Sequence, residues 1–74
     1  MEERVRAIMA DIFLVEAAQI GTGTSMATLA KWDSLAQIDL IAALEEEFGV
    51  TFDVEDFELM TDFATVVKTL SDKM

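Results

Sequence analysis

The sequence predicts an all-α fold, a small four-helix bundle of three longer helices and one short helix, with a long loop between the first and second helices. Three observations support this prediction. Apolar residues recur at helical spacing in three segments, only one short stretch suits an extended conformation, and 74 residues suffice for one small hydrophobic core. We therefore expect a single domain over residues 1–74.

The first helix is predicted over about residues 2–18. Its apolar positions recur at i, i+3, i+7 and i+10 and are widened by two neighbours: Val5, Ile8, Ile12 and Val15, with Met9 and Leu14. The glycines and hydroxyl residues of 21–25 then indicate a loop, which continues toward Trp32. So long a loop in so short a chain is typical of a crossover between helices.

The second helix is predicted from Asp33 and Ser34 to Phe48, followed by Gly49 as its C-terminal cap. Either Asp33 or Ser34 can cap the unpaired amides of the first turn, and Gln37 stands three residues after Ser34, as in a capping box.

Two further helices are predicted after a short extended link at residues 50–52. The first is a brief helical turn around residues 54–60. The second begins after Thr61 as its cap and carries apolar residues at i, i+3, i+4 and i+7: Phe63, Val66, Val67 and Leu70.

The second helix has apolar residues on two flanks. One flank, expected to face the core, holds Leu40, Ile41, Leu44 and Phe48. The other holds Leu35, Ile38 and Ala42, interleaved with Asp39, Glu45 and Glu46. This second flank is either a widened core face or an apolar patch with a charged rim that docks a partner, and the spacing leaves both interpretations open.

The net charge of −10 lies in the middle of the chain. Ten acidic residues and no Lys or Arg occur from Asp33 to Asp62, while five acids and five bases balance elsewhere. Such a charge disfavours nucleic acid and anionic lipid surfaces and suits basic protein partners. It is explained either by a solvated face or by a docking surface.

Several classes of function are excluded by composition. The chain has no Cys and no His, which removes disulfides, thiolate nucleophiles, and the commonest general base and metal ligand, so we expect no catalysis by the chain alone. The acids of residues 53–58 lack the spacing and central glycine of a calcium loop, and we expect no metal site. The apolar runs are too short to insert in a membrane and the N-terminus lacks signal-peptide features, which favours a cytoplasmic protein.

The segment Trp32-Asp33-Ser34-Leu35-Ala36-Gln37-Ile38-Asp39-Leu40-Ile41-Ala42-Ala43-Leu44-Glu45-Glu46-Glu47-Phe48-Gly49-Val50 resembles the phosphopantetheine attachment site and second helix of acyl carrier proteins. The resemblance extends over the whole chain through its length, acid excess and helix order. It implies a carrier without catalytic activity, which holds acyl groups as thioesters on a 4'-phosphopantetheine arm. A phosphopantetheinyl transferase would attach this arm, taken from coenzyme A, to Ser34.

The resemblance also implies roles for the residues around Ser34. Asp33 would help to position the metal ion and coenzyme A during transfer of the arm. Basic patches on acyl-loading and acyl-processing enzymes would dock on the second helix, at Leu35, Ile38, Asp39, Ala42, Glu45 and Glu46. We expect the carrier to be a monomer.

The pathway and one alternative function remain open. Trp32 and Ala36 differ from the usual residues of fatty-acid carriers and look more like stand-alone carriers of polyketide, modified-lipid or other specialised pathways, so fatty acid, polyketide and specialised lipid biosynthesis are all retained. The alternative is an unmodified acidic helical adaptor or inhibitor that binds a basic enzyme through the same helix.

Overall fold

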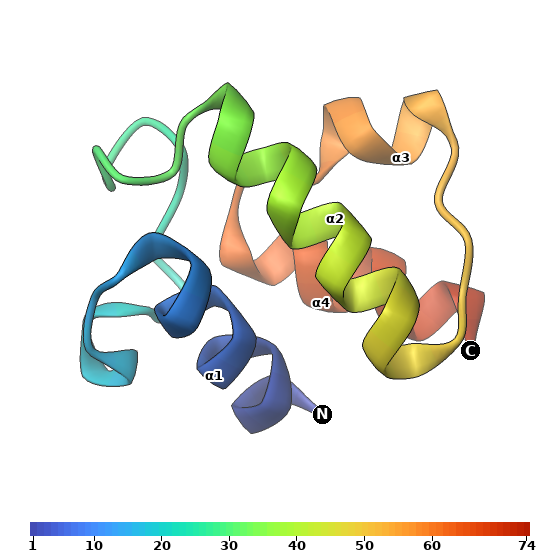
Figure 1. The fold of residues 1–74 in the computed structure, drawn as a ribbon, viewed down its shortest axis with the longest axis horizontal. Coiled ribbons are helices and arrows are strands. Elements are labelled where there is room, and N and C mark those ends of the chain that lie inside the picture. Colours follow the sequence, from blue (N-terminus) through green and yellow to red (C-terminus); the bar gives the residue numbers. More distant parts are fainter.

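A computed structural model describes all 74 residues and confirms the all-α prediction. Four α-helices follow one another along the chain, namely α1 (Glu2–Phe13), α2 (Ser34–Phe48), α3 (Val54–Leu59) and α4 (Phe63–Lys73), with a short 3₁₀ helix, η1 (Ala17–Gln19), after α1. The long loop between α1 and α2 and the short third helix are both present (Figure 1).

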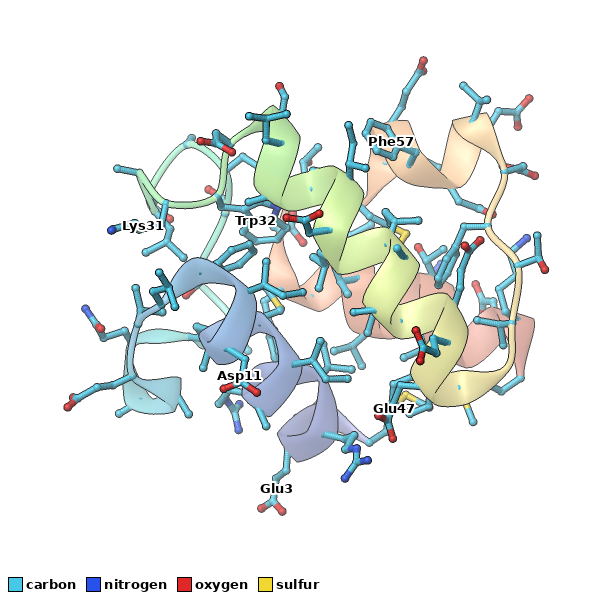
Figure 2. The ribbon with its side chains drawn as sticks, in the orientation of Figure 1. Glu3, Asp11, Lys31, Trp32, Glu47 and Phe57 are labelled. Atoms are coloured by element: carbon cyan, nitrogen blue, oxygen red, sulfur yellow. The ribbon has the colours of Figure 1, made fainter.

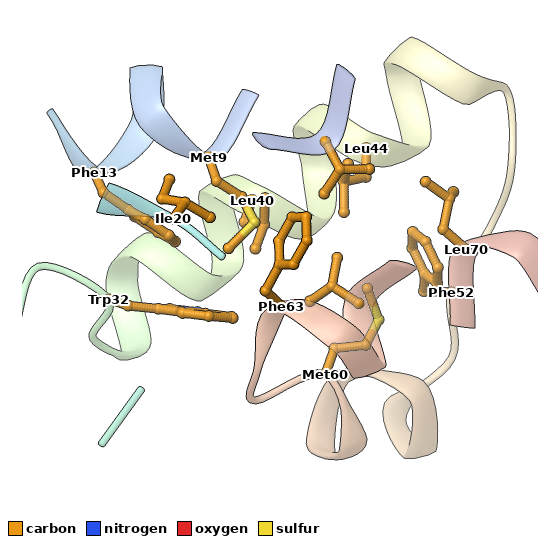
Figure 3. Close-up of a cluster of buried hydrophobic side chains, with 12 residues drawn as sticks. Met9, Phe13, Ile20, Trp32, Leu40, Leu44, Phe52, Met60, Phe63 and Leu70 are labelled. Atoms are coloured by element: carbon orange, nitrogen blue, oxygen red, sulfur yellow. The ribbon is translucent and has the colours of Figure 1, made fainter. Parts of the chain in front are cut away.

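The hydrophobic core lies among α1, α2 and α4 (Figure 3). It contains twelve buried side chains: Val5, Met9, Phe13, Ile20, Trp32, Leu40, Leu44, Phe52, Met60, Phe63, Val66 and Leu70. Burial of this apolar surface is the main driving force for folding, and each buried Leu or Phe contributes about 1.5–3 kcal/mol. The predicted core flank of α2 is confirmed, since Leu40 and Leu44 are buried and Ile41 and Phe48 pack against the cluster.

The first helix is shorter than predicted. It ends at Phe13, because Leu14 adopts the left-handed conformation with φ 57° and its amide bonds to the carbonyl of Ala10. The chain then reverses through η1, which brings Ile20 into the core, and Arg6 Nε donates to the Ile20 carbonyl at 2.8 Å. Leu14 is 81% exposed, so its assignment to the apolar stripe was wrong.

Aspartates cap the later helices. Asp33 Oδ1 accepts from the Ala36 amide at 2.9 Å, and Asp62 Oδ1 accepts from the Thr65 amide at 2.7 Å. The predicted capping box at Ser34 and the predicted cap at Thr61 were therefore wrong. A carboxylate is favoured here because it satisfies an unpaired amide and interacts with the positive end of the helix dipole. The C-terminal cap of α2 at Gly49 is confirmed, with φ 65°.

The loop between α1 and α2 is tied to the start of α4. Ser25 and Asp62 form an isolated antiparallel bridge, in which the Met26 amide bonds to the Thr61 carbonyl and the Phe63 amide to the Thr24 carbonyl, both at 2.9 Å. The loop therefore reaches Trp32 and the start of α2 along a defined path.

Candidate functional site

Ser34 lies at the N-terminal end of α2 and is exposed. Asp33 before it has an extended backbone, with φ −104° and ψ −175°, and its side chain caps the helix. The amides of the first helical turn point toward this end of α2, where the helix dipole is positive. A phosphate group attached to Ser34 would be stabilised by both features.

Trp32, two residues before Ser34, anchors this end of α2 in the core. The indole is 1% exposed and stacks on Phe13, with ring centroids 5.2 Å apart. Its Nε1–H donates a hydrogen bond to Gln37 Oε1 at 2.6 Å. The backbone leading to Ser34 is therefore held by a buried side chain, while Ser34 itself remains accessible.

Gln37 is a structural residue of the site that the sequence interpretation missed. It is 2% exposed, and its Nε2 donates to the carbonyl oxygens of Met60 at 2.8 Å and Phe57 at 3.2 Å. The side chain thus joins α2 to the C-terminal end of α3, which lie side by side in Figure 2. Gln37 precedes Leu40 by three residues and Leu44 by seven, so it lies on the core flank of α2. This spacing is the signal that would have predicted burial of the Gln37 side chain.

The second apolar flank of α2, here called the outer flank, is exposed to solvent and does not form part of the core. Leu35 is 75% exposed and Ile38 is 55% exposed, and Ala42 is exposed as well. Asp39 and Glu46 stand in solvent beside them. Of the two interpretations of this flank, the widened core face is excluded, and an apolar patch with an acidic rim remains.

Glu45 differs from the other acids assigned to this flank. It is half-buried, and its carboxylate accepts a hydrogen bond from the Phe52 amide at 2.8 Å. Glu45 therefore supports the link between α2 and α3. Elsewhere on the helix, Glu47 pairs with Arg4 of α1 (Figure 2).

One ion pair joins α3 to α4. Lys73 Nζ lies 2.8 Å from Asp56 Oδ2. The hydrogen bond from Lys73, aided by the backbone amide of Asp53, lowers the pKa of Asp56, and the hydrogen bond to Asp56 raises the pKa of Lys73. Each partner favours the charged form of the other.

The surface hollow between α3 and α4 is polar. Six of its seven lining residues are polar or charged, and the seventh is Leu59. No group of three or more acidic side chains is arranged to hold a metal ion. None of the helices has the length and apolar content required to cross a bilayer.

Comparison with known proteins identifies the class to which this arrangement belongs. Residues 3–70 match the family model described as the phosphopantetheine attachment site. The acyl carrier protein of Thermosynechococcus vestitus is 36% identical over 72 residues, which cover 97% of this chain and 89% of the relative. The acyl carrier protein of Petrotoga mobilis is 33% identical over 72 residues, which cover 97% of this chain and 85% of the relative.

The fold agrees with the same class. The solution structure of a holo acyl carrier protein from Geobacter metallireducens superposes with a TM-score of 0.86, at 19% identity, over 97% of this chain and 83% of that one. This chain therefore belongs to the acyl carrier protein family, whose members are carriers of covalent phosphopantetheine rather than enzymes. Membership implies interaction with a phosphopantetheinyl transferase and with acyl-processing enzymes in general.

Proposed function

We propose that Ser34 is the residue to which the 4'-phosphopantetheine arm is attached, and that residues 1–74 act as one carrier domain. The observation that carries this proposal is the exposed Ser34 hydroxyl at the N-terminus of α2, within the segment matched by the family model. The helix terminus favours the phosphodiester. The arm supplies the thiol that the Cys-free chain lacks, and acyl groups are held on it as thioesters.

Asp33 is proposed to act beside Ser34 during attachment. Its carboxylate caps α2 by accepting from the Ala36 amide and is exposed. The oxygen that does not cap the helix is available to a metal ion that accompanies coenzyme A on the transferase. Asp33 then has two roles, one in helix capping and one in arm transfer.

The first experiment is incubation with coenzyme A and a broad-specificity phosphopantetheinyl transferase, followed by intact mass measurement. We expect the wild-type chain to gain the mass of one phosphopantetheine group and Ser34→Ala to gain none. Ser71→Ala is the matched control, because Ser71 is also an exposed serine but lies near the C-terminal end of α4. The Ser71→Ala variant should be modified like the wild type. Absence of a mass gain on the wild type would instead favour the unmodified adaptor.

Partner enzymes are proposed to dock on the exposed flank of α2 through basic patches. Leu35, Ile38 and Ala42 supply the apolar contacts and Asp39 and Glu46 the charged rim. Glu45 belongs to the same surface but also binds the Phe52 amide. Complementary charge accelerates encounter of such partners, more at low salt than at high salt.

Charge reversal at one exposed acid tests the docking face. We expect Glu46→Lys to slow arm transfer by about 3- to 10-fold at low ionic strength, with the difference shrinking as salt is added. Glu3→Lys makes the same change on α1, away from this face, and should have little effect. Equal behaviour of the two variants would contradict the proposed docking face.

The acyl cargo is proposed to come from polyketide or another specialised lipid pathway, with fatty acid synthesis as the alternative. This proposal depends on Trp32 and Ala36 in the attachment segment. Trp32 is buried, so its difference from fatty-acid carriers lies in packing rather than in a docking contact. Mass spectrometry of the acyl group on the protein isolated from its host distinguishes the pathways. A cytoplasmic location and a monomeric state, expected from the sequence, stay predictions.

A further inference from the structure

Helix α3 is positioned by polar contacts and by the burial of Phe52 and Met60, which flank it. It has six residues and no fully buried side chain, and a helix this short is not stable in isolation. Its N-terminus is closed by a reciprocal capping box between Asp53 and Asp56, and Lys73 pairs with Asp56. At its C-terminal end the contact with α2 is made by the buried amide of Gln37.

The Gln37 amide satisfies three groups at once. The carbonyls of Phe57 and Met60 accept no backbone hydrogen bond, and both are bonded by Gln37 Nε2. Its oxygen accepts from the Trp32 indole, and no buried side-chain polar atom in the protein lacks a partner. A leucine at this position of the core flank would fill space but would leave two carbonyls without donors. Buried polar groups bonded in this way define one arrangement of the elements they join.

Gln37 joins a residue next to the proposed attachment segment to the C-terminal end of α3. Trp32 is two residues before Ser34, and Phe57 and Met60 define the end of α3. The contacts of Gln37 therefore help to fix the exposed side chains of Val54 and Leu59 on α3 relative to Ser34 on α2.

We infer that Gln37 is a positioning residue that fixes α3 relative to Ser34, so that α3 and the outer flank of α2 present one rigid surface to the phosphopantetheinyl transferase. This inference rests on the proposed modification of Ser34. Residues 33–62, which include α2 and α3, contain ten acidic residues and no Lys or Arg, which suits a partner with a basic surface. Loss of the Gln37 contacts to α3 weakens recognition of the carrier and leaves the chemistry at the serine unchanged.

Gln37→Glu tests the contact with α3 selectively. The introduced carboxylate can still accept from the Trp32 indole, but it has no donor for the Phe57 and Met60 carbonyls and repels them. Gln37→Met removes all three hydrogen bonds with nearly the same side-chain length. Because both variants lose the donors to α3, we expect each to raise the KM of the transferase for the carrier by about 5- to 10-fold with kcat unchanged.

Two control variants separate positioning from loss of stability. Gln19→Glu makes the same chemical change on exposed η1, where the Gln19 side chain bonds only the Glu16 amide. Val5→Ala removes buried methyl groups from the core side of α1 and lowers stability, while every residue of α2 and α3 is kept. Both controls should keep the wild-type KM. If Gln37 variants shown to be folded by circular dichroism also keep it, the inference is overturned.

Hydrogen exchange on the unmodified wild type provides a test that needs no variant. If Gln37 couples α2 to α3, the side-chain amide protons of Gln37 and the backbone amide of Met60 exchange through one opening event, and low denaturant accelerates both equally. If the two exchange rates depend differently on denaturant, the inference is overturned. This result holds even if the Gln37 variants do not fold, because the experiment uses the wild type. If the wild-type chain gains no mass, the proposed function is overturned. If the wild type is modified but the Gln37 variants keep the wild-type KM, only the inference about Gln37 is overturned.

Discussion

Helices α3 and α4 follow α2 in succession, and both begin with an aspartate cap, yet they are held in opposite ways. Helix α4 buries Phe63, Val66 and Leu70 in the core. Helix α3 buries no side chain completely and is held by Gln37, by Lys73 and by its own capping box. Helix α4 is thus fixed by apolar side chains of its own, whereas α3 is held by directed polar contacts and by the burial of Phe52 and Met60 at its two ends.

This difference separates the stable part of the molecule from the part beside the proposed attachment serine. Apolar burial contributes most of the folding free energy, so α1, α2 and α4 should unfold together. A segment with few buried apolar contacts opens at lower free energy than the core. The helix that we propose to be recognised together with Ser34 is therefore also the helix whose position depends most on individual hydrogen bonds.

A matched pair of leucines gives the largest expected contrast. Leu70 on α4 is fully buried, whereas Leu59 on α3 is 63% exposed. We expect Leu70→Ala to lower the free energy of unfolding by about 2–5 kcal/mol, because it removes core contacts and leaves a cavity, and Leu59→Ala to change it by less than about 0.5 kcal/mol. Urea unfolding followed by circular dichroism measures both. A comparable loss for Leu59→Ala would show that α3 is anchored by apolar burial after all.

The two aspartate caps give a smaller contrast. Asp62→Ala removes the cap of α4 and should lower the free energy of global unfolding by about 1 kcal/mol. Asp53→Ala removes the cap of α3, and its effect on global unfolding is limited by the free energy at which α3 opens by itself. We expect it to appear chiefly as faster hydrogen exchange at the Phe57 and Met60 amides, measured by NMR. Unchanged exchange at these amides, with a full loss of global stability, would place α3 in the same cooperative unit as α4.

The same contrast explains which parts of the fold could be predicted from the sequence. The buried face of α4 was predicted because repeated apolar spacing reports burial directly, and the end of α2 was predicted because Gly49 suits the left-handed conformation found there. The turn at Leu14 was missed because an apolar residue in a left-handed, exposed position contradicts local preference. It results from packing of Ile20 against the core, a contact between distant residues.

The candidate site divides in the same way. The segment around Ser34 was recognisable from its residues, and the spacing of Leu35 and Ile38 placed them off the core flank. Their exposure had to come from the structure, because it depends on how α3 and α4 pack around α2. Gln37 was assigned to a local capping box because its actual partners, Trp32, Phe57 and Met60, are set by tertiary structure.

The ion pair between α3 and α4 gives the smallest effect and a defined dependence on pH. Because Lys73 lowers the pKa of Asp56 below its ordinary 3.8, the pair stabilises the fold above that pH, and this contribution is lost as the pH falls through the lowered value. Because Asp56 raises the pKa of Lys73 above its ordinary 10.5, the contribution is also lost as the pH rises through the raised value. Asp56→Asn should therefore unfold more easily than the wild type between these limits.

The difference between wild type and Asp56→Asn should disappear at strongly acidic and strongly alkaline pH. Thermal unfolding across this range measures it, and added salt should reduce it because both side chains are partly exposed. Asp72→Asn is the matched control, since the pair of Asp72 with Lys68 lies within α4 at 4.0 Å and is largely exposed. If the stability difference between wild type and Asp56→Asn does not change with pH, the effect of the substitution comes from the reciprocal capping box with Asp53. Contacts other than the ion pair would then hold α3 to α4.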